Sequence, residues 1–502
     1  MHWGDMVEIG VRDLAEVVEG TLVASEADAR RVVTGVALDS REVVDGAVFF
    51  AFVGEHADGN DFCAAAVEAG AGAVVTTREP SSSLRALAGE FVCPLVVADD
   101  AQAALRALAG WWRARLRCVV VGVTGSVGKT TTKDLVAGVL ARRYKTHATS
   151  GNHNNEIGVP LTILSAPLDT EALVVEMGMR GEGQIASLAE LAHPGIGVVT
   201  KIGSSHIELL GSREAIARAK GELLASLTPR GTAVVNADDE MTPALLDGAH
   251  IADGVRVLRF GLGEGVGDTG DAGSAGDAGG AGAPPDVTAR GITFDETACA
   301  AFTLEVSGVG SADVTLAVPG LHAVTDALAA SAVGVALGLD VTDIAIGLAQ
   351  VRPAGMRMEV LAAPGGAKIV NDAYNANPES MSAALDTLAD MTCSSRRIAV
   401  LGDMGELGGL SEELHAGIGE RAAQLCAAGR LDALVCVGTL ASHIAEGARC
   451  GGMPDGAVRF FDTAEEALSH LTGELACGPG DVVLVKASRF MALERIVEGL
   501  VR

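Results

Sequence analysis

Two patterns of apolar and polar positions alternate along most of the chain. Short runs of consecutive apolar residues predict strands buried on both faces, and stretches with apolar residues three or four positions apart predict helices. The predicted strands are 32–38, 47–52, 73–76, 95–98, 118–123, 172–176, 196–200, 232–236, 255–260, 287–294, 368–371, 397–401, 433–437 and 481–486. The clearest helical stretches are 63–70, 101–116, 133–140 and 213–224. This alternation predicts an α/β fold with parallel sheets covered on both sides.

The alternation divides the chain into three blocks. The first, residues 1–98, contains short strands and ends before a helical stretch. The second, residues 99–352, has the most continuous apolar strands, and the third, residues 353–502, repeats the same alternation. Pro353 ends a helical pattern at the junction between these two blocks. We therefore predict three α/β domains with these boundaries.

One segment departs from both patterns. Residues 261–285 consist mainly of Gly, Ala, Asp, Ser and Pro, with few large apolar side chains. Burial cannot offset the ordering entropy of such a segment, so we expect a mobile surface loop. Because a strand is predicted on each side of it, the loop is expected to be an insertion within the second block.

The composition argues against several classes of protein. Apolar residues make up 49% of the 502 residues, which is enough for large cores and argues against global disorder. The formal net charge of −28 argues against a nucleic-acid binder or a protein of anionic membrane surfaces. No apolar run reaches the ~20 residues of a membrane helix, and the N-terminus lacks a signal-peptide pattern. Nine scattered cysteines without a C-x-x-C pair indicate reduced thiols, so we expect a cytoplasmic protein.

A glycine-rich segment follows the predicted strand at 118–123. It reads Thr-Gly-Ser-Val-Gly-Lys-Thr-Thr over residues 124–131 and leads into a helical stretch. In such a turn, backbone N–H groups converge on phosphate oxygens, the lysine reaches the terminal phosphates, and a hydroxyl can bind Mg²⁺. The glycine spacing is shorter than in the strict Walker motif, because Val123 stands five positions before Gly128. The residues expected at a bound nucleoside triphosphate are Gly125, Ser126, Gly128, Lys129, Thr130 and Thr131.

Polar residues gather where the strands of the second block end. They are Glu176, Thr200, Lys201, Asn236 and Asp238. Ligands of open α/β sheets bind beyond these carboxyl ends, so Glu176 and His206 are candidate Mg²⁺ ligands, although histidine is an uncommon one. Lys220, in the helical stretch 213–224, does not suit a cation site unless it is paired or covalently modified so that its charge is removed.

Two further loops are rich in amide and carboxyl groups. The loop at 151–160 is a candidate binding loop for a polar ligand. The loop at 371–380 follows a strand and enters a helix, with Asn377 as the N-cap and Pro378 as the first helical residue. The candidate binding residues of the two loops are Asn152, Asn155, Glu156, Asp372, Tyr374, Asn375 and Asn377.

These segments resemble the Mur ligase family, the ATP-dependent amide-bond ligases of bacterial peptidoglycan assembly. The resemblance covers nearly the whole chain and is carried by residues 39–41, 46–51, 54–59, 124–131, 151–160, 176–178, 372–380, 401–408 and 485–489. The run Tyr-Asn-Ala-Asn-Pro at 374–378 is the most specific part and resembles the members that add D-alanyl-D-alanine to UDP-N-acetylmuramoyl-tripeptide. The resemblance implies an N-terminal domain for the UDP substrate, a central P-loop ATPase domain and a C-terminal Rossmann-like domain.

The resemblance also implies a mechanism and a role for each candidate residue. ATP would phosphorylate the peptide carboxylate, and the amine of D-alanyl-D-alanine would displace phosphate from the acyl phosphate. The implied catalytic residues are Lys129, Lys220, His206 and Arg357. The implied Mg²⁺ site comprises Thr130, Glu176, His206 and a carbamylated Lys220. The implied nucleotide contacts beyond the glycine-rich loop are His322, Asp326 and Asp372. Ser40, Arg41 and the loop at 152–155 would face the UDP-peptide, and a monomer without nucleic-acid partners or membrane insertion is expected.

The adenine side departs from the family pattern Gly-x-His-Asn-x-x-Asn. Here His322 is followed by Ala323, and Asp326 stands at the second asparagine position. An ionised carboxylate accepts a hydrogen bond but cannot donate one, so we expect weaker selectivity for the base.

Three alternatives are weighed against a D-alanyl-D-alanine-adding ligase. The run at 374–378 disfavours the ligase that adds the third peptide residue, and the N-terminal uridine-type segment disfavours a folylpolyglutamate synthetase. A nucleotide switch without ligase chemistry would not need Lys220 beside Glu176 and His206.

Overall fold

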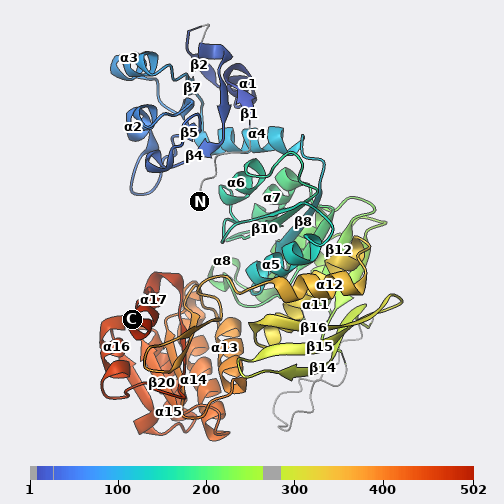
Figure 1. Cartoon of the computed structure of the whole chain (residues 1–502), viewed down its shortest axis with the longest axis vertical. Helices are drawn as coiled ribbons and strands as arrows, with labels where there is room; N and C mark the ends of the chain where they lie inside the picture. The colour runs from blue at the N-terminus through green and yellow to red at the C-terminus, as the bar shows by residue number, and fades with distance from the viewer. Residues whose placement is uncertain (1–7, 26–27, 264–283) are drawn as a thin grey trace.

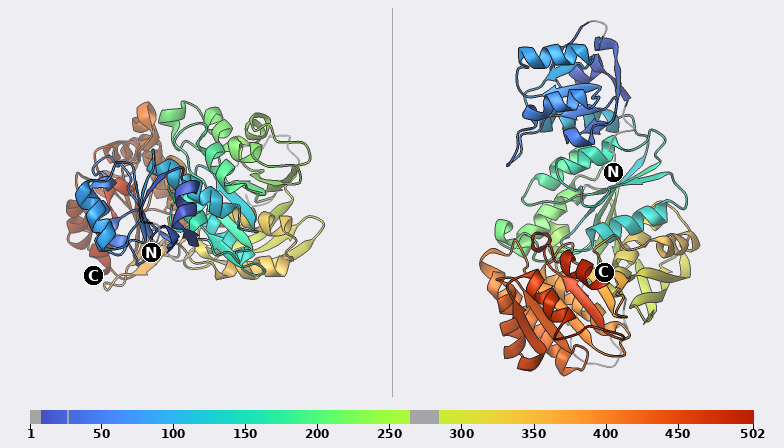
Figure 2. Two further views of the ribbon diagram at one scale, coloured as in Figure 1. Left: turned by 90° about the horizontal axis from the view of Figure 1, so that it is seen from above. Right: turned by 60° about the vertical axis from the view of Figure 1, so that its left-hand side comes forward.

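The computed structural model describes residues 8–25, 28–263 and 284–502, which form three large sheets and one strand pair. The N-terminal sheet lies at one end of the molecule, and the C-terminal sheet packs beside the central one at the other end (Figures 1 and 2). Most of the loop expected at 261–285 lies outside the described residues. The predicted three-part α/β architecture is confirmed, while the domain boundaries at 98 and 352 stay predictions.

The N-terminal unit has helices on both faces of a five-stranded sheet. In spatial order its strands are β2 (Thr21–Val23), β7 (Leu95–Val97), β6 (Ala73–Thr76), β5 (Val48–Phe50) and β4 (Val36–Ala37). Its helices are α1 (Val11–Val17), α2 (Cys63–Glu68) and α3 (Ser82–Glu90), and β1 (Glu8–Gly10) pairs with β3 (Val32–Thr34). Phe49 and Phe50 point into the separate cores on the two faces. The strand predicted at 32–38 is two strands, because Gly35 between them has a positive φ of 72°.

The central unit is built on a nine-stranded sheet. Its order is β16 (Gly310–Pro319), β15 (Cys299–Val306), β14 (Val287–Phe294), β13 (Arg256–Phe260), β12 (Thr232–Asn236), β11 (Ile196–Val199), β8 (Val119–Thr124), β10 (Ala172–Glu176) and β9 (Thr146–Ala148). The expectation of a parallel sheet is wrong at one edge, where β14, β15 and β16 are antiparallel. β15 buries every second residue and leaves the others partly exposed, a pattern typical of antiparallel strands with one solvated face.

Two layers of helices cover the central sheet. One layer comprises α5 (Lys129–Leu140), α11 (Leu321–Ala336) and α12 (Val341–Gln350). The other comprises α4 (Ala101–Arg113), α6 (Gly158–Leu164), α7 (Gln184–Ala192), α9 (Arg213–Ala225) and α10 (Thr242–Gly248), with the short α8 (Ile207–Leu210) beside it. Val120 and Val121 of β8 enter the two opposite cores, which accounts for the continuous apolar strand in the sequence.

The C-terminal unit has a six-stranded sheet with helices on both faces. Its order is β17 (Glu359–Ala362), β18 (Lys368–Asp372), β22 (Val482–Lys486), β19 (Arg397–Gly402), β20 (Ala433–Val437) and β21 (Val458–Phe461). One face packs on α13 (Pro378–Asp390), α14 (Ser411–Ala427) and α15 (Ala441–Cys450), the other on α16 (Ala464–Thr472) and α17 (Glu494–Val501). All nine cysteines are free thiols. In the described part of the chain, no helix combines the length and apolar character that crossing a bilayer requires.

Candidate functional site

The glycine-rich loop lies at the carboxyl end of β8, which is an interior strand of the central sheet. α5 begins at Lys129, four residues earlier than the helical stretch indicates, directly after Gly128 with its φ of 83°. The Nζ atom of Lys129 donates a hydrogen bond to the Gly125 carbonyl at 2.7 Å. Burial lowers the pKa of Lys129, and the positive charge of Arg357 lowers it further, while Glu176 opposes both. Glu406 acts in the same direction as Glu176, so two cations and two carboxylates interact beside the loop.

The strand-end residues after β11 brace this loop from behind. The Thr200 hydroxyl donates to the Val127 carbonyl at 2.5 Å, and the Ser126 N–H donates to the Lys201 carbonyl at 2.7 Å. A Cβ atom on Gly125 would lie 1.8 Å from the Thr200 hydroxyl, so only glycine fits there. Thr200 and Lys201 thus shape the loop through its backbone.

Glu176 and Thr130 bring two oxygen ligands together beside the loop. The Thr130 hydroxyl donates to Glu176 Oε2 at 2.9 Å, and Asn154 Nδ2 donates to Oε1 at 2.7 Å. Mg²⁺ is usually held by one or two protein oxygens together with substrate phosphates, so this pair fits such an ion. Within the described ranges no cluster of three or more His, Cys, Asp or Glu residues could hold a metal by itself. Asn154 lies within the loop at 152–155 that is expected to face the UDP-peptide, but it was not singled out there as a candidate residue.

Lys220 lies on α9 and is 2% exposed. Burial, with a smaller contribution from the charge of Lys129, shifts its pKa well below the usual lysine value. No hydrogen bond or ion pair to its amine is found among the residues that the structure describes. Burial therefore disfavours the charged form of the Lys220 amine, and the charge of Lys129 acts in the same direction.

His206 faces the C-terminal unit. It precedes α8 with a φ of 65°, and its Nδ1 atom lies 2.6 Å from Glu406 Oε2, in the loop after β19. This contact lowers the pKa of Glu406, and Lys129 contributes to the same shift. Glu406 was missed as a site residue, because only the folded chain brings it opposite His206.

Two more contacts join the central and C-terminal units. Glu379, in the first turn of α13, accepts hydrogen bonds from the Ser204 N–H at 2.7 Å and the Ser204 hydroxyl at 3.2 Å. Asn377 Nδ2 donates to the Ser205 hydroxyl at 2.6 Å, and this hydroxyl donates to the Ser126 carbonyl of the loop at 3.3 Å. The N-cap of α13 is thus connected to the glycine-rich loop through one serine.

The loop after β18 brings further predicted residues to this junction. The Arg357 guanidinium lies 4.1 Å from the centre of the Tyr374 ring, and burial raises the pKa of Tyr374. Asp372 Oδ2 accepts from Lys486 at 2.6 Å, and Lys486 also donates to the Asn375 carbonyl at 2.9 Å. This buried ion pair fixes the loop, so the Asp372 carboxylate already has a partner.

His322 and Asp326 occupy successive turns at the start of α11. Burial lowers the pKa of His322, and its Nδ1 atom has no partner among the described residues. Asp326 Oδ1 accepts from the Thr132 hydroxyl at 3.0 Å, and burial raises the pKa of Asp326 to about 7.

Other predicted residues lie away from these contacts. Ser40 and Arg41 belong to a short 3₁₀ turn of the N-terminal unit, where Arg41 is paired with Asp39 and its side chain is 86% exposed. Asn155 accepts from the Gly158 N–H at 2.9 Å at the start of α6, while Asn152 and Glu156 are exposed.

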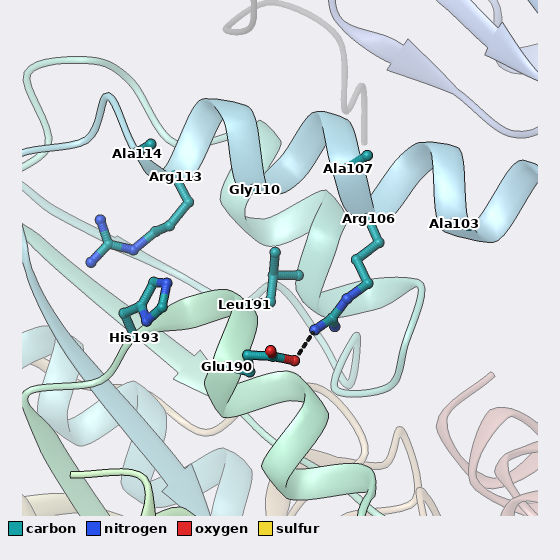
Figure 3. Close-up of a pocket in the computed structure, with 9 residues that line it drawn as sticks. All are labelled: Ala103, Arg106, Ala107, Gly110, Arg113, Ala114, Glu190, Leu191 and His193. Carbon is teal, nitrogen blue, oxygen red and sulfur yellow. Dashed lines mark hydrogen bonds and ion pairs between the residues drawn. The ribbon is translucent and has the colours of Figure 1, made fainter. Parts of the chain in front are cut away.

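A cavity of about 610 Å³ lies between α4 and α7, apart from the glycine-rich loop (Figure 3). The two arginines and the glutamate that line it already have partners. Arg106 pairs with Glu190 at 2.9 Å, and Arg113 Nε donates to the Ala192 carbonyl at 2.8 Å. The cavity is thus a seam between two helices, and its charged groups stabilise their packing.

Three family models match the chain in succession. They are described as "Mur ligase family, catalytic domain" over residues 32–109, "Mur ligase middle domain" over 123–334 and "Mur ligase, glutamate ligase domain" over 356–489.

Full-length relatives carry one and the same enzyme name. The UDP-N-acetylmuramoyl-tripeptide--D-alanyl-D-alanine ligase of Bacillus subtilis is 35% identical over 498 residues, 99% of each chain. The ligase of that name from Mycobacterium tuberculosis is 38% identical and covers 99% of this chain and 98% of its own. Among solved structures, MurF from Acinetobacter baumannii superposes with a TM-score of 0.83 at 29% identity, over 99% of each chain. A MurF ligase from Thermotoga maritima in complex with ADP gives 0.74 at 29% identity, over 93% of this chain and 96% of its own.

Proposed function

The chain belongs to the Mur ligase family, and we propose that it catalyses the ATP-dependent addition of D-alanyl-D-alanine to UDP-N-acetylmuramoyl-tripeptide. The observation that carries this proposal is the convergence of two units on the glycine-rich loop. The central unit supplies Lys129, and the C-terminal unit brings Arg357 and Glu406 close enough to influence its pKa. A ligase needs such an arrangement, because ATP and the acceptor must meet in line.

The reaction forms an acyl phosphate and then an amide. The carboxylate of the tripeptide attacks the γ-phosphate of ATP and releases ADP. The free amine of D-alanyl-D-alanine then attacks the acyl carbon, and inorganic phosphate leaves. Lys129 and Arg357 neutralise the charge that develops on the transferred phosphoryl group, and the loop N–H groups orient it.

Thr130 and Glu176 would hold Mg²⁺, with His206 nearby. When bound, the ion would neutralise charge on the β- and γ-phosphates. The buried amine of Lys220, whose charged form burial disfavours, suits carbamylation, in which the neutral amine adds to the carbon of CO₂ and releases one proton. The product is an anionic group that suits a cation site, which an ammonium does not. The burial of Lys220 and its lowered pKa support this modification.

The remaining assignments concern substrates and setting. Ser40, Arg41 and the loop at 152–155 would contact the UDP-peptide, and Tyr374 with Asn375 would face the acceptor side. His322 and Asp372 would lie toward the nucleoside of ATP. We propose a monomer in the cytoplasm, where the UDP-linked substrate would be made. The ligase that adds the third peptide residue is not favoured, because the full-length relatives carry the D-alanyl-D-alanine name.

Phosphate release tests this function directly. Release from ATP is expected only when UDP-N-acetylmuramoyl-tripeptide, D-alanyl-D-alanine and Mg²⁺ are all present. Equal phosphate release when either UDP-N-acetylmuramoyl-tripeptide or D-alanyl-D-alanine is omitted would overturn the proposal. The third-residue alternative is tested in a second assay. There the corresponding UDP-linked dipeptide replaces the UDP-linked tripeptide, and a free diamino acid replaces D-alanyl-D-alanine.

A further inference from the structure

α11 places a carboxyl group against the back of the glycine-rich loop. Asp326 is 6% exposed, and its Oδ1 atom accepts the hydrogen bond from Thr132. A Cβ atom on Gly128 would lie 2.4 Å from this same oxygen, so the carboxyl is in contact with the loop backbone. The Thr132 N–H donates to the Gly128 carbonyl at 2.8 Å, which closes a compact unit of three residues where α5 begins.

The second carboxyl oxygen has no partner. Oδ2 of Asp326 is buried and makes no hydrogen bond to any described residue. An ionised carboxylate in this position would leave a charged atom without water or a donor, which is costly. Burial accordingly raises the pKa of Asp326 to about 7, and the Thr132 hydroxyl opposes this only in part.

The charged groups around Asp326 do not offset the upward shift of its pKa. His322 stands one turn earlier on the same helix, and burial lowers the pKa of its imidazole. The lysines of α5 are engaged elsewhere, since Lys129 donates to the Gly125 carbonyl and Lys133 donates to the Thr149 carbonyl. No charged side chain of the described strands, or of α12 and α13, contributes to the pKa of Asp326.

We propose that Asp326 is a positioning residue that supports ATP binding in its protonated form, holding Thr132 and Gly128 without placing a negative charge behind the triphosphate. A protonated carboxyl has one acceptor and one donor, as an asparagine side chain does. This differs from the ionised Asp326 expected from the sequence, while the weaker base selectivity inferred there stays a prediction. This inference rests on the proposed ATP site.

Calorimetric titration of the full chain with ADP and with ATP, without the other substrates, tests the proposal. Asp326→Asn is the key variant, because its amide keeps an acceptor for Thr132 and cannot ionise. Between about pH 6 and about pH 8.5, nucleotide affinity of the unmodified chain should fall about 30-fold, following the protonated fraction of a group with a pKa of about 7. Asp326→Asn should lose this dependence and retain only the change due to the nucleotide's own ionisation. Asp247→Asn, on an exposed residue of α10, should behave like the unmodified chain.

A second variant separates positioning from simple structural support. Thr132→Val removes the one group that lowers the pKa of Asp326, so the pH midpoint of binding should move upward. Thermal unfolding of each variant shows whether it is folded. Identical pH profiles for the unmodified chain and Asp326→Asn would overturn the proposal, and so would an unmoved midpoint in a folded Thr132→Val. If nucleotide binding follows the expected pH profile but no ligase turnover is found, the role of Asp326 is supported. That result would count only against the proposed ligase function.

Discussion

Glu379 offers a direct way to perturb the junction between the central and C-terminal units. Its carboxylate accepts two hydrogen bonds from Ser204, which is 7% exposed. Glu379→Ala would leave the Ser204 N–H without an acceptor when the two units meet. A hydrogen bond to a charged group contributes about 1.5–3 kcal/mol, so the closed arrangement should become roughly 10- to 150-fold less favourable. Since ligation requires both units around the loop, kcat/KM for D-alanyl-D-alanine should fall by a factor in that range.

The control for this variant is Glu412→Ala. Glu412 also stands in the first turn of a helix, α14, but it is exposed. Glu412→Ala therefore removes one carboxylate near a helix N-terminus, as Glu379→Ala does, but leaves the hydrogen bonds of Ser204 in place. Steady-state kinetics gives kcat/KM, and small-angle scattering reports whether the molecule becomes more extended. If Glu379→Ala keeps kcat/KM within about twofold of the control and scatters identically, the reasoning about this contact is refuted.

Three further predictions concern single positions. Lys220→Ala should abolish ligation, and a short carboxylic acid should partly restore it by replacing the carbamate. If no acid restores activity, the result counts against the carbamylation of Lys220. Gly125→Ala should lose nucleotide affinity by about 10-fold or more, because its Cβ would meet the Thr200 hydroxyl, and calorimetry showing unchanged affinity would contradict the assigned loop geometry. Burial lowers the pKa of His415, whose Nε2 accepts from the Met404 N–H, so the unfolded chain gains this proton more readily than the folded one. Stability should therefore fall as pH decreases below about 6.5, and thermal melting should show a smaller fall for His415→Gln; equal pH profiles would refute this assignment.

Much of the fold follows from the continuity of apolar runs. The strands predicted at 172–176, 232–236, 287–294 and 433–437 have the same bounds in the structure, because polar or glycine-containing turns flank each run. The start of α5 was placed four residues late, since the first helical turn is part of the phosphate-binding sequence and lacks an amphipathic pattern. β15 and β16 were missed because polar residues such as Thr303, Glu305 and Thr315 interrupt their apolar positions, so neither strand is one continuous apolar run.

The candidate site was predictable where its residues are close in sequence. The glycine-rich loop and the N-cap Asn377 are local features, and the structure has Asn377 as the N-cap and Pro378 as the first helical residue, as expected. Glu379 and Ser204 are separated by 175 positions, so their contact depends on how the two units pack, which no local pattern specifies. Asp326 was assigned by analogy to an asparagine, whereas its protonation depends on burial that only the folded chain defines. The roles of the catalytic residues stay predictions until substrates are bound.

The central claim is that this chain joins D-alanyl-D-alanine to UDP-N-acetylmuramoyl-tripeptide at the expense of ATP. Mass spectrometry of the reaction mixture tests it most directly. We expect a UDP-linked product heavier than the substrate by one dipeptide minus one water, formed in equal amount to the ADP released. ADP formation without that product, or a product that carries a single amino acid in place of the dipeptide, would contradict it.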